Sequence, residues 1–305
     1  MPTVSGPLVA VAFLGGVWLI APRGVPGRAL APFLMLPLVL STGSTSPGQG
    51  FDVHVLDVGH GQSVLVRAGP ETWLVGTGPG DGAGLDVVAG TLKPVIRRYG
   101  RGRVDLAVAS PEGRVYAGGL ASVESLYAPG RILAWPGREG AEACREGLVH
   151  QAGQVRLEVL HPAPALPDLG HNSGCVIRIS GPGGSLVIPG PVDEAVETRL
   201  ARHGPDPAAK VLLAARQGHE ASTTADFLDA VDPQKVVASA GAGNRFELPH
   251  AALEARLEAR GIGFAGTHEC GAVTIGFRPG LEPRMETARG QSRRFWHANP
   301  LARCP

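Results

Sequence analysis

The sequence predicts an α/β fold in which two sheets lie between two layers of helices, an αββα sandwich preceded by a short hydrophobic arm. Between residues 51 and 75, three short β-rich runs follow one another and are expected to pair locally. From residue 192 onward, strand-like runs alternate with helix-like runs, so two sheets covered by helices are the expected assembly. The 305 residues, with 44 glycines and 27 prolines, suffice for one large domain with many turns.

The first forty residues have a composition typical of a membrane segment. Pro7 to Pro22 is an uncharged apolar run, Arg23 to Arg28 is a short basic turn, and Ala29 to Leu40 is apolar again. The first run is near the lower length limit of a spanning helix, and the second is shorter than the roughly 20 residues that a bilayer requires. We expect residues 1–40 to form a membrane arm of one or two helices; a secretory signal and a buried apolar arm stay open as alternatives.

Residues 41–50 (STGSTSPGQG) are small, polar and turn-forming, which predicts a linker before a domain spanning residues 51–278. The helix expected near the start of this domain ends in Arg97, Arg98 and Gly100, a composition that suits a helix C-terminus. The first elements are expected to be the strands Phe51–Val58, Ser63–Arg67 and Thr72–Val75, the helix Asp86–Tyr99 and the strand Asp105–Ala109.

The remaining elements follow from the same periodicities. The expected helices are Gly118–Leu126, Val192–His203, Ala221–Val231 and Ala251–Arg260. The expected strands are Arg131–Trp135, Val155–Leu160, Val211–Ala214, Lys235–Ser239 and Ala272–Phe277, with a hairpin formed by Cys175–Ile179 and Ser185–Ile188. Residues 279–305 are rich in Arg, Pro and Gly and are predicted to form a loosely ordered tail.

Charge and cysteine content set limits on function. The formal charge of +1 gives no long-range field for nucleic acid, so any DNA contact needs a local basic patch. The four cysteines include no C-x-x-C pair, which argues against a zinc knuckle, and one or two disulfides stay open if the domain lies outside the cytoplasm. The absence of a G-x-S-x-G elbow and of a Walker-type loop excludes serine-hydrolase and P-loop chemistry.

Ordered motifs along the domain carry a family resemblance. Residues 55–66 read VLDVGHGQSVLV, and shorter matches follow at 74–78 (LVGTG), 105–108 (DLAV), 118–120 (GGL), 157–162 (LEVLHP), 172–178 (NSGCVIR) and 239–246 (SAGAGNRF). In these runs and in their order the chain resembles the C-terminal, metallo-β-lactamase-like domain of the ComEC family of DNA-uptake membrane proteins. The resemblance covers residues 51 to 277 and implies the metallo-β-lactamase form of the αββα sandwich.

Hydrolysis in this fold depends on metal ions held by His and Asp side chains, which lower the pKa of a bound water. The family's H-x-[HD]-x-D-H cluster should follow the strand 105–109, where this chain reads SPEGRVYAGG. Val115 and Tyr116 stand nearest to the D-H pair, and Arg114 adds a positive charge. Only Glu112 offers a ligand, and one carboxylate does not hold a catalytic metal.

The other ligand loops of the family are altered as well. Pro191 stands where the T-G-D turn has its carboxylate, and Arg216 and Gln217 stand at the H-H-G loop. In the segment that resembles Y-G-H-P-H, Phe246 to His250 reads FELPH and keeps one histidine of two. We therefore expect a degenerate site at Glu112, Tyr116, Pro191, Arg216 and Gln217, with no metal cofactor.

Two further sets of residues carry alternatives. A zinc or manganese site built from Glu112, Asp193, His219 and His250 would make the chain an active metal-dependent nuclease or phosphodiesterase. Seven histidines share no ligand spacing and are expected to be structural when they are not part of that alternative site: His54, His60, His161, His171, His219, His250 and His268. Arg97, Arg98, Arg101 and Arg103, with Tyr99 interleaved, form the densest basic stretch; it is interpreted as a solvated helix end, with a single-stranded DNA contact as the alternative.

The resemblance implies a pseudoenzyme domain that takes part in DNA internalisation without cutting the strand. It also implies a place at the bacterial inner membrane, with other DNA-uptake components as partners. Arg23 and Arg28 favour the cytoplasmic side for the turn between the two apolar runs, which puts the globular domain on the outer, periplasmic side. A decayed fragment without function is the third reading.

Overall fold

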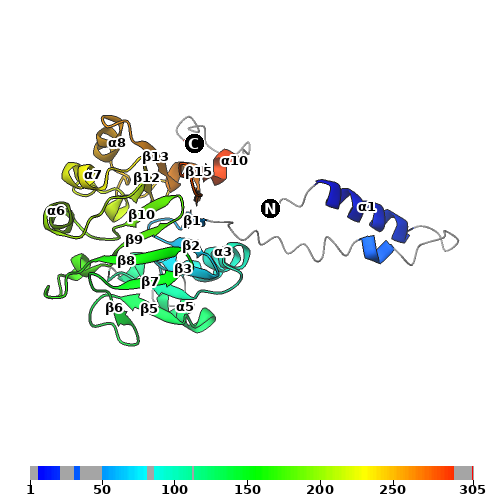
Figure 1. The fold of residues 1–305 in the computed structure, drawn as a ribbon, viewed down its shortest axis with the longest axis horizontal. Coiled ribbons are helices and arrows are strands. Elements are labelled where there is room, and N and C mark those ends of the chain that lie inside the picture. Colours follow the sequence, from blue (N-terminus) through cyan, green and yellow to red (C-terminus); the bar gives the residue numbers. More distant parts are fainter. Residues whose placement is uncertain are drawn as a thin grey trace. The chain divides into compact units, whose positions relative to one another are not determined.

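The computed structural model describes residues 6–20, 31–34, 50–80, 86–111, 113–291 and 304, in two units that comprise residues 1–46 and 47–305. In the first unit, α1 spans Gly6–Ile20, and residues 31–34 form a further helical turn (Figure 1). The predicted arm thus contains helix in its first apolar run. Within the described part of the chain, no helix combines the length and the hydropathy needed to cross a membrane.

The described part of the second unit holds two mixed sheets (Figure 1). The first has the strand order β15-β14-β1-β2-β3-β4-β5-β6, and the second has the order β13-β12-β11-β10-β9-β8-β7. The strands of the first sheet are β1 Phe51–Val55, β2 Val64–Ala68, β3 Glu71–Val75, β4 Leu106–Val108, β5 Arg131–Ala134, β6 Glu142–Ala143, β14 Val273–Phe277 and β15 Arg284–Thr287. Those of the second are β7 Val149–Ala152, β8 Val155–His161, β9 Val176–Gly181, β10 Gly184–Ile188, β11 Val211–Leu213, β12 Lys235–Ala238 and β13 Gly263–Gly266.

Each sheet changes from antiparallel to parallel pairing along its width. In the first sheet β1, β2 and β3 pair antiparallel, and β3, β4, β5 and β6 pair parallel. In the second, β7 to β10 pair antiparallel, and β10 to β13 pair parallel. The parallel halves need crossover connections, which supply the helices that cover the sheets.

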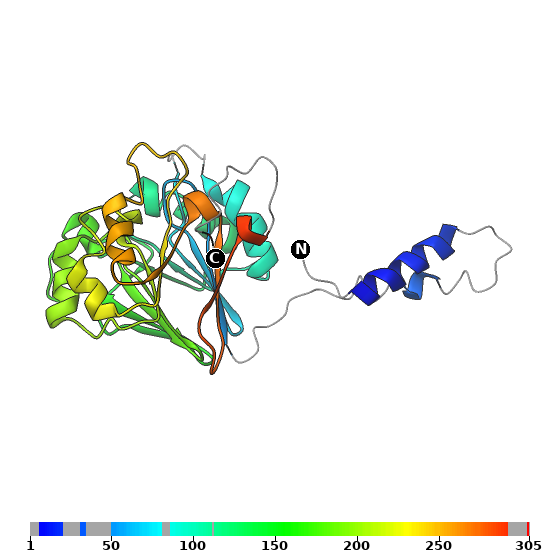
Figure 2. The same cartoon turned by 90° about the horizontal axis from the view of Figure 1, so that it is seen from above.

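Helices cover the outer face of each sheet, on opposite sides of the pair (Figure 2). Against the first sheet lie η2 Val88–Leu92, α3 Lys93–Tyr99 and α5 Leu120–Tyr127. Against the second lie α6 Glu194–His203, α7 Ala225–Val231 and α8 Ala251–Glu258. The short helices are α4 Gly113–Tyr116, η3 Gly170–Ser173, η4 Ala215–Gln217, α9 Thr267–Cys270 and α10 Ala288–Gln291.

Alternation along the strands builds three apolar layers. In β2, Val64 and Val66 point into the core between the sheets, whereas Leu65 points to the helices η2 and α3. In β10, Leu186 belongs to the central core and Val187 to the layer beneath α6 and α7. Both faces of each sheet are therefore buried, which confirms the predicted αββα layering.

Two local predictions differ from the structure. The single helix predicted for residues 86–99 begins with the π-helical turn Val88–Leu92 and continues as α3, and Asp86 accepts a hydrogen bond from the Val88 amide at 2.9 Å. The tail predicted to be loosely ordered contains β15, whose Met285 is opposite Ile275, and α10. A disulfide also joins Cys304 to Cys270. The Arg-, Pro- and Gly-rich composition of this segment gives no sequence signal for the edge strand β15 or for the Cys270–Cys304 disulfide.

Candidate functional site

The candidate site is the edge where the parallel strands of both sheets end. The amide of Thr77, after β3, donates to the Tyr116 carbonyl at 2.8 Å, which places α4 above the end of β3. The amide of Arg216, after β11, donates to the Gly190 carbonyl at 2.9 Å, which joins the loops that follow β10 and β11. Loops at the carboxyl ends of parallel strands are the usual position of sites in α/β folds.

Tyr116 and Gln217 bring the two sheets' loops together. Nε2 of Gln217 lies 3.4 Å from the hydroxyl oxygen of Tyr116, and both side chains are buried. Oε1 of Gln217 is buried as well and has no hydrogen-bond partner within the described residues. Two positions predicted to be degenerate thus contact each other, and a phenol and an amide occupy the place where the family's ligands are expected.

Arg216 and Gln217 lie in a strained turn. Their φ angles are 48° and 62°, and Gly218 follows at 87°, so three successive residues adopt the left-handed conformation. Such a conformation costs free energy at non-glycine residues and persists only where the surroundings enforce it. The Gly190 carbonyl and the amide of His250, which donates to the Gly218 carbonyl at 2.9 Å, hold this turn.

Pro191 is buried and faces the second sheet's antiparallel half. A Cβ atom added to Gly174 would lie 3.0 Å from Cδ of Pro191, so this proline packs against the start of β9. Gly190, which precedes this proline, lies near Ser110: a Cβ atom added to Gly190 would be 3.3 Å from Oγ of Ser110. The ring offers no ligand atom.

Of the alternative ligand set, Glu112 lies outside the described residues, and the other three side chains have other partners. Asp193 caps α6 by accepting from the Ala195 amide at 2.9 Å, and His171 lies 3.3 Å from its other oxygen. Nδ1 of His219 accepts from the Ala221 amide at 3.2 Å, and Nδ1 of His250 caps α8 by accepting from Ala252 at 3.2 Å. The second nitrogen of His250 lies 3.6 Å from Glu220.

The donor chemistry of this edge does not fit the family's metal. The pKa of Asp193 is lowered: burial alone would raise it, but hydrogen bonds with Asn172 and Ala195 stabilise the charged carboxylate and outweigh burial. This carboxylate therefore already has hydrogen-bond donors. Among the residues that the structure describes, no group of three His, Cys, Asp or Glu side chains is arranged to hold a metal ion. Asp193, His219 and His250 are therefore not assembled as the alternative requires, and we derive no step through a metal.

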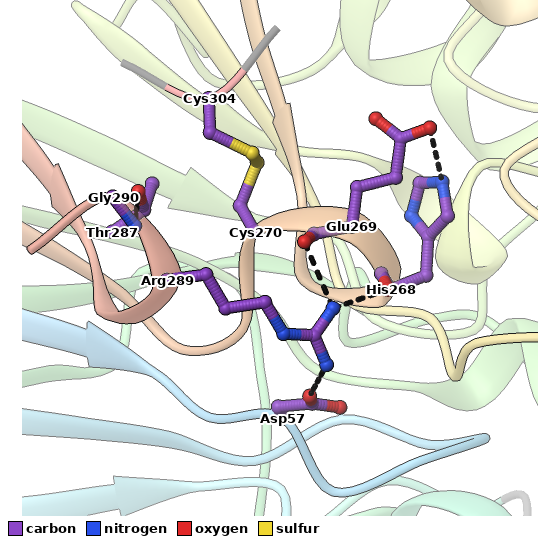
Figure 3. Close-up of a disulfide and its surroundings, with 8 residues drawn as sticks. All are labelled: Asp57, His268, Glu269, Cys270, Thr287, Arg289, Gly290 and Cys304. Atoms are coloured by element: carbon purple, nitrogen blue, oxygen red, sulfur yellow. Dashed lines mark hydrogen bonds and ion pairs between the residues drawn. A yellow bond between two sulfur atoms is a disulfide. The ribbon is translucent and has the colours of Figure 1, made fainter. Parts of the chain in front are cut away.

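A half-buried carboxylate fixes the turn that carries the family motif. Asp57, directly after β1, has its Oδ2 3.4 Å from Nη2 of Arg289, and Nη1 of Arg289 donates to the carbonyls of His268 and Glu269 at 2.8 Å each (Figure 3). Burial raises the pKa of Asp57, and the Arg289 guanidinium opposes that rise. The Cys270–Cys304 disulfide lies beside this contact on the same short helix, α9 (Figure 3).

The arginine-rich segment lies at the other end of β3. Oγ1 of Thr72, near the start of that strand, donates to the Gly100 carbonyl at 2.9 Å, whereas Thr77 past its end contacts Tyr116. The five residues of β3 separate the two ends by roughly 16 Å. Arg97, Arg98, Arg101 and Arg103 are exposed there.

Local contacts decide which of these arginines are available. Cζ of Arg98 lies 5.0 Å from the Tyr99 ring centroid, a cation–π contact that orients the guanidinium. Arg103 pairs with Asp105 at 3.2 Å and donates to the Pro70 carbonyl at 2.7 Å. Arg97 and Arg98 thus remain directed to solvent, while Arg103 contributes to the fold.

Five of the seven histidines expected to be structural occupy separate places. His54 stacks on Tyr99 with centroids 4.3 Å apart, and burial, together with Arg67 and Arg98, lowers its pKa to about 4. Nε2 of the buried His161 lies 2.7 Å from the Asn172 carbonyl. His268 is on α9, His171 contacts Asp193, and His60 stacks on Phe246.

Both pairs of cysteines form disulfides. Cys144 bonds Cys175 across the two sheets, and Cys270 bonds Cys304. The sequence left their connectivity open; in the structure Cys175 is buried and bonded to Cys144. Disulfides persist in oxidising compartments.

Sequence reasoning did not find three contacts of this region: Tyr116 with Gln217, Asp57 with Arg289, and His60 with Phe246. The family motifs already mark Tyr116 and Gln217 as positions of one site, so these motifs could have indicated that the two residues lie close together. The other two connect residues 232 and 186 positions apart, and nothing in the local pattern around either residue indicates its partner.

The two sheets, their helical layers and the loops that converge at one edge define an αββα sandwich protein. No family model matches the chain. It is 30% identical to Competence protein ComA of Neisseria gonorrhoeae over 276 residues, 90% of this chain and 39% of that protein. It is 26% identical to ComE operon protein 3 of Bacillus subtilis over 45% of this chain and 18% of that protein, and 22% identical to the Escherichia coli protein YcaI over 74% and 30%.

The chain is thus a homologue of these competence proteins, which confirms the resemblance found in the sequence. It spans less than two fifths of the length of each relative. Similar solved structures include the metallo hydrolase Igni18 of Ignicoccus hospitalis (14% identity, TM-score 0.49, 74% of this chain and 100% of that chain). The metallo-beta-lactamase fold protein YhfI of Bacillus subtilis has 12% identity and a TM-score of 0.47 over 71% and 95%.

Proposed function

We propose that the chain is a non-hydrolytic, metallo-β-lactamase-like domain of a ComEC-type competence protein that contacts single-stranded DNA during uptake. The observation that carries this proposal is the Tyr116–Gln217 contact, which puts a phenol and an amide at the junction of the two sheets' loops. Neither group replaces the histidine and carboxylate ligands that activate a metal-bound water. The 30% identity to a competence protein supports DNA uptake as the process.

The DNA contact is proposed at the exposed arginines beyond the start of β3. Arg97 and Arg98 lie in the last turn of α3, and Tyr99, its last residue, offers a partly exposed ring on which a base can stack. Arginine suits phosphate because its guanidinium forms two parallel hydrogen bonds to an anion. Arg67 and Arg98 both lie close enough to His54 to disfavour its protonation, which Asp52 favours, so two arginines are near each other at this end of the sheet.

The proposed location is the outer side of the bacterial inner membrane. Two disulfides are compatible with an oxidising space outside the cytoplasm. The helix α1 contains no charged residue, in line with the membrane arm expected for residues 1–40.

Binding of single-stranded DNA at several salt concentrations tests the proposal. Changing Arg98→Ala together with Arg101→Ala should weaken binding and reduce the slope of log K against log salt by about 1.4, because each lost phosphate contact contributes about 0.7. The matched control is Arg202→Ala with Arg260→Ala, which removes one paired arginine on α6 and one in the turn after α8. Equal affinities of the two double variants would contradict the proposed contact, and metal-dependent cleavage of the DNA would contradict the non-hydrolytic role.

A further inference from the structure

Three planar side chains form a pile at the rim of the site edge. The rings of His60 and Phe246 stack with centroids 4.7 Å apart and planes 28° apart. Cζ of Arg245 lies 4.7 Å from the centroid of the same Phe246 ring. Phe246 is 48% exposed although both neighbours contact it, so the pile is open to solvent.

Two loops from different sheets are joined to hold this pile. Oγ of Ser239, after β12, donates to the Gly61 carbonyl at 2.9 Å. A Cβ atom on Gly241 would lie 2.9 Å from the Gly59 carbonyl carbon, so only glycine permits this approach. The turn that carries His60 and the loop that carries Phe246 are thus fixed against each other.

Asn244 fixes the conformation of the loop itself. Its Nδ2 donates to the carbonyls of Gly241 and Leu248 at 2.9 and 2.6 Å, and its Oδ1 accepts from the amides of Phe246 and Leu248 at 3.2 and 3.0 Å. These four hydrogen bonds from the Asn244 side chain fix the loop and hold Phe246 in place at the surface. An exposed aromatic ring on such a loop loses little conformational entropy when it binds a ligand.

We propose that His60, Phe246 and Arg245 are a stacking platform for a base of single-stranded nucleic acid. Aromatic rings and guanidinium planes are the surfaces on which unpaired bases stack, and such stacking tolerates any base because each has a π-face. Arg245 is exposed and carries the charge that a neighbouring phosphate requires, while the exposed Glu247 on the same loop disfavours a second phosphate beside it.

The platform extends the proposed function, on which it rests, by adding a base contact to the phosphate contacts near Arg98. The platform lies at the end of β3 that is opposite to Arg98. A Cβ atom on Gly61, the neighbour of His60, would contact the Val115 carbonyl, and the next residue, Tyr116, lies past the end of β3. One strand of DNA that reached both places would contact the domain along the length of its sheets.

Affinity for two oligomers of the same length tests the platform on the full chain. One is oligo-dT, and the other is the same phosphodeoxyribose backbone without bases. The wild-type chain should bind oligo-dT more tightly, and Phe246→Ala should weaken oligo-dT binding by about 5- to 150-fold, which corresponds to one lost stacking contact. The abasic oligomer should bind both proteins equally.

Matched variants separate stacking from folding. Phe246→Trp should keep the preference for bases, whereas Phe246→Leu, which keeps apolar bulk without a ring, should lose it. Leu281→Ala removes a comparably exposed apolar side chain elsewhere and should change nothing. If Phe246→Ala leaves oligo-dT affinity unchanged while the Arg98 and Arg101 variant weakens both oligomers, the platform is wrong and the proposed function stands. If the wild-type chain binds neither oligomer, both proposals are wrong.

Discussion

Gln217 donates a hydrogen bond to the hydroxyl of Tyr116, 101 residues earlier in the chain, with 3.4 Å between nitrogen and oxygen. Tyr116 is on α4, which follows β4 of the first sheet along the chain. Gln217 is the last residue of η4, which follows β11 of the second sheet. The contact therefore bridges the two sheets at the edge where their parallel strands end.

The Tyr116–Gln217 bridge should contribute measurably to stability. Tyr116→Phe removes the hydroxyl, and Gln217→Leu removes the amide together with a buried carbonyl oxygen that has no described partner. A double-mutant cycle in urea should give a coupling free energy of about 1 kcal/mol, the usual size for a buried hydrogen bond. Tyr127→Phe, on a half-buried ring of α5, is the control and should change stability little. Zero coupling would mean that the two groups do not depend on each other.

The Arg289–Asp57 contact should stabilise the turn after β1. Arg289→Leu removes the guanidinium that joins Asp57 to the carbonyls of α9, which leaves a half-buried carboxylate without its ion pair. We expect a loss of about 1–3 kcal/mol and a further rise in the pKa of Asp57, because Arg289 is the cation that opposes the effect of burial.

Urea unfolding and NMR titration of Asp57 measure these two effects. Arg284→Ala is the matched control, since that arginine is largely exposed and pairs with Glu286 on the strand surface. A pKa of Asp57 that is the same with and without Arg289 would show that the contact has no electrostatic role.

His54 should make stability depend on acid pH. Its folded-state pKa of about 4 lies below the unfolded value of 6.5, so the folded state resists protonation. The stability that this provides is complete above pH 6.5 and is lost as the pH falls toward 4. The loss amounts to about 3 kcal/mol, since each pKa unit corresponds to about 1.4 kcal/mol.

Urea unfolding between pH 7 and pH 4 tests this dependence. His54→Gln keeps a polar group near Thr274, which lies 3.0 Å from Nδ1, but it does not titrate, so the slope should flatten. His203→Gln at the exposed end of α6 should leave the slope as in the wild-type chain. An unchanged slope in the His54 variant would assign the acid sensitivity to other groups.

The Cys144–Cys175 disulfide should contribute more than any single contact described above. Replacing both cysteines by alanine reopens a loop of 31 residues in the unfolded chain, for which chain entropy predicts a loss of about 3.5 kcal/mol. Urea unfolding measures this loss. Alkylation of the unreduced wild-type chain, followed by mass measurement, should detect no free thiol, and one or more alkylated cysteines would contradict the pairing.

The layered fold could be predicted because its signals are local. The alternation of Val64, Leu65 and Val66 and the helical period of residues 194–203 each indicate which face is buried. Strands β7, β13 and β15 were missed because they are four residues long and carry polar or glycine residues, so their pairing with neighbouring strands decides their conformation.

The candidate site was predictable only in part. Family motifs indicate that Tyr116, Pro191, Arg216 and Gln217 stand at ligand positions, but not that Gln217 contacts Tyr116. The partner of Cys175 carries no sequence signal, since four cysteines allow three connectivities. The pile of His60, Phe246 and Arg245 depends on the close approach of Gly59 and Gly241, which is a property of the tertiary fold.

The metal content of the 305-residue chain tests the central claim most directly. The chain is dialysed against zinc or manganese, freed of excess metal and measured by mass spectrometry of its elements, in parallel with an assay for cleavage of single-stranded DNA. We predict well under one metal ion per chain and no metal-dependent cleavage. One tightly bound ion per chain, with cleavage that is lost in Asp193→Asn or His219→Ala, would contradict the account.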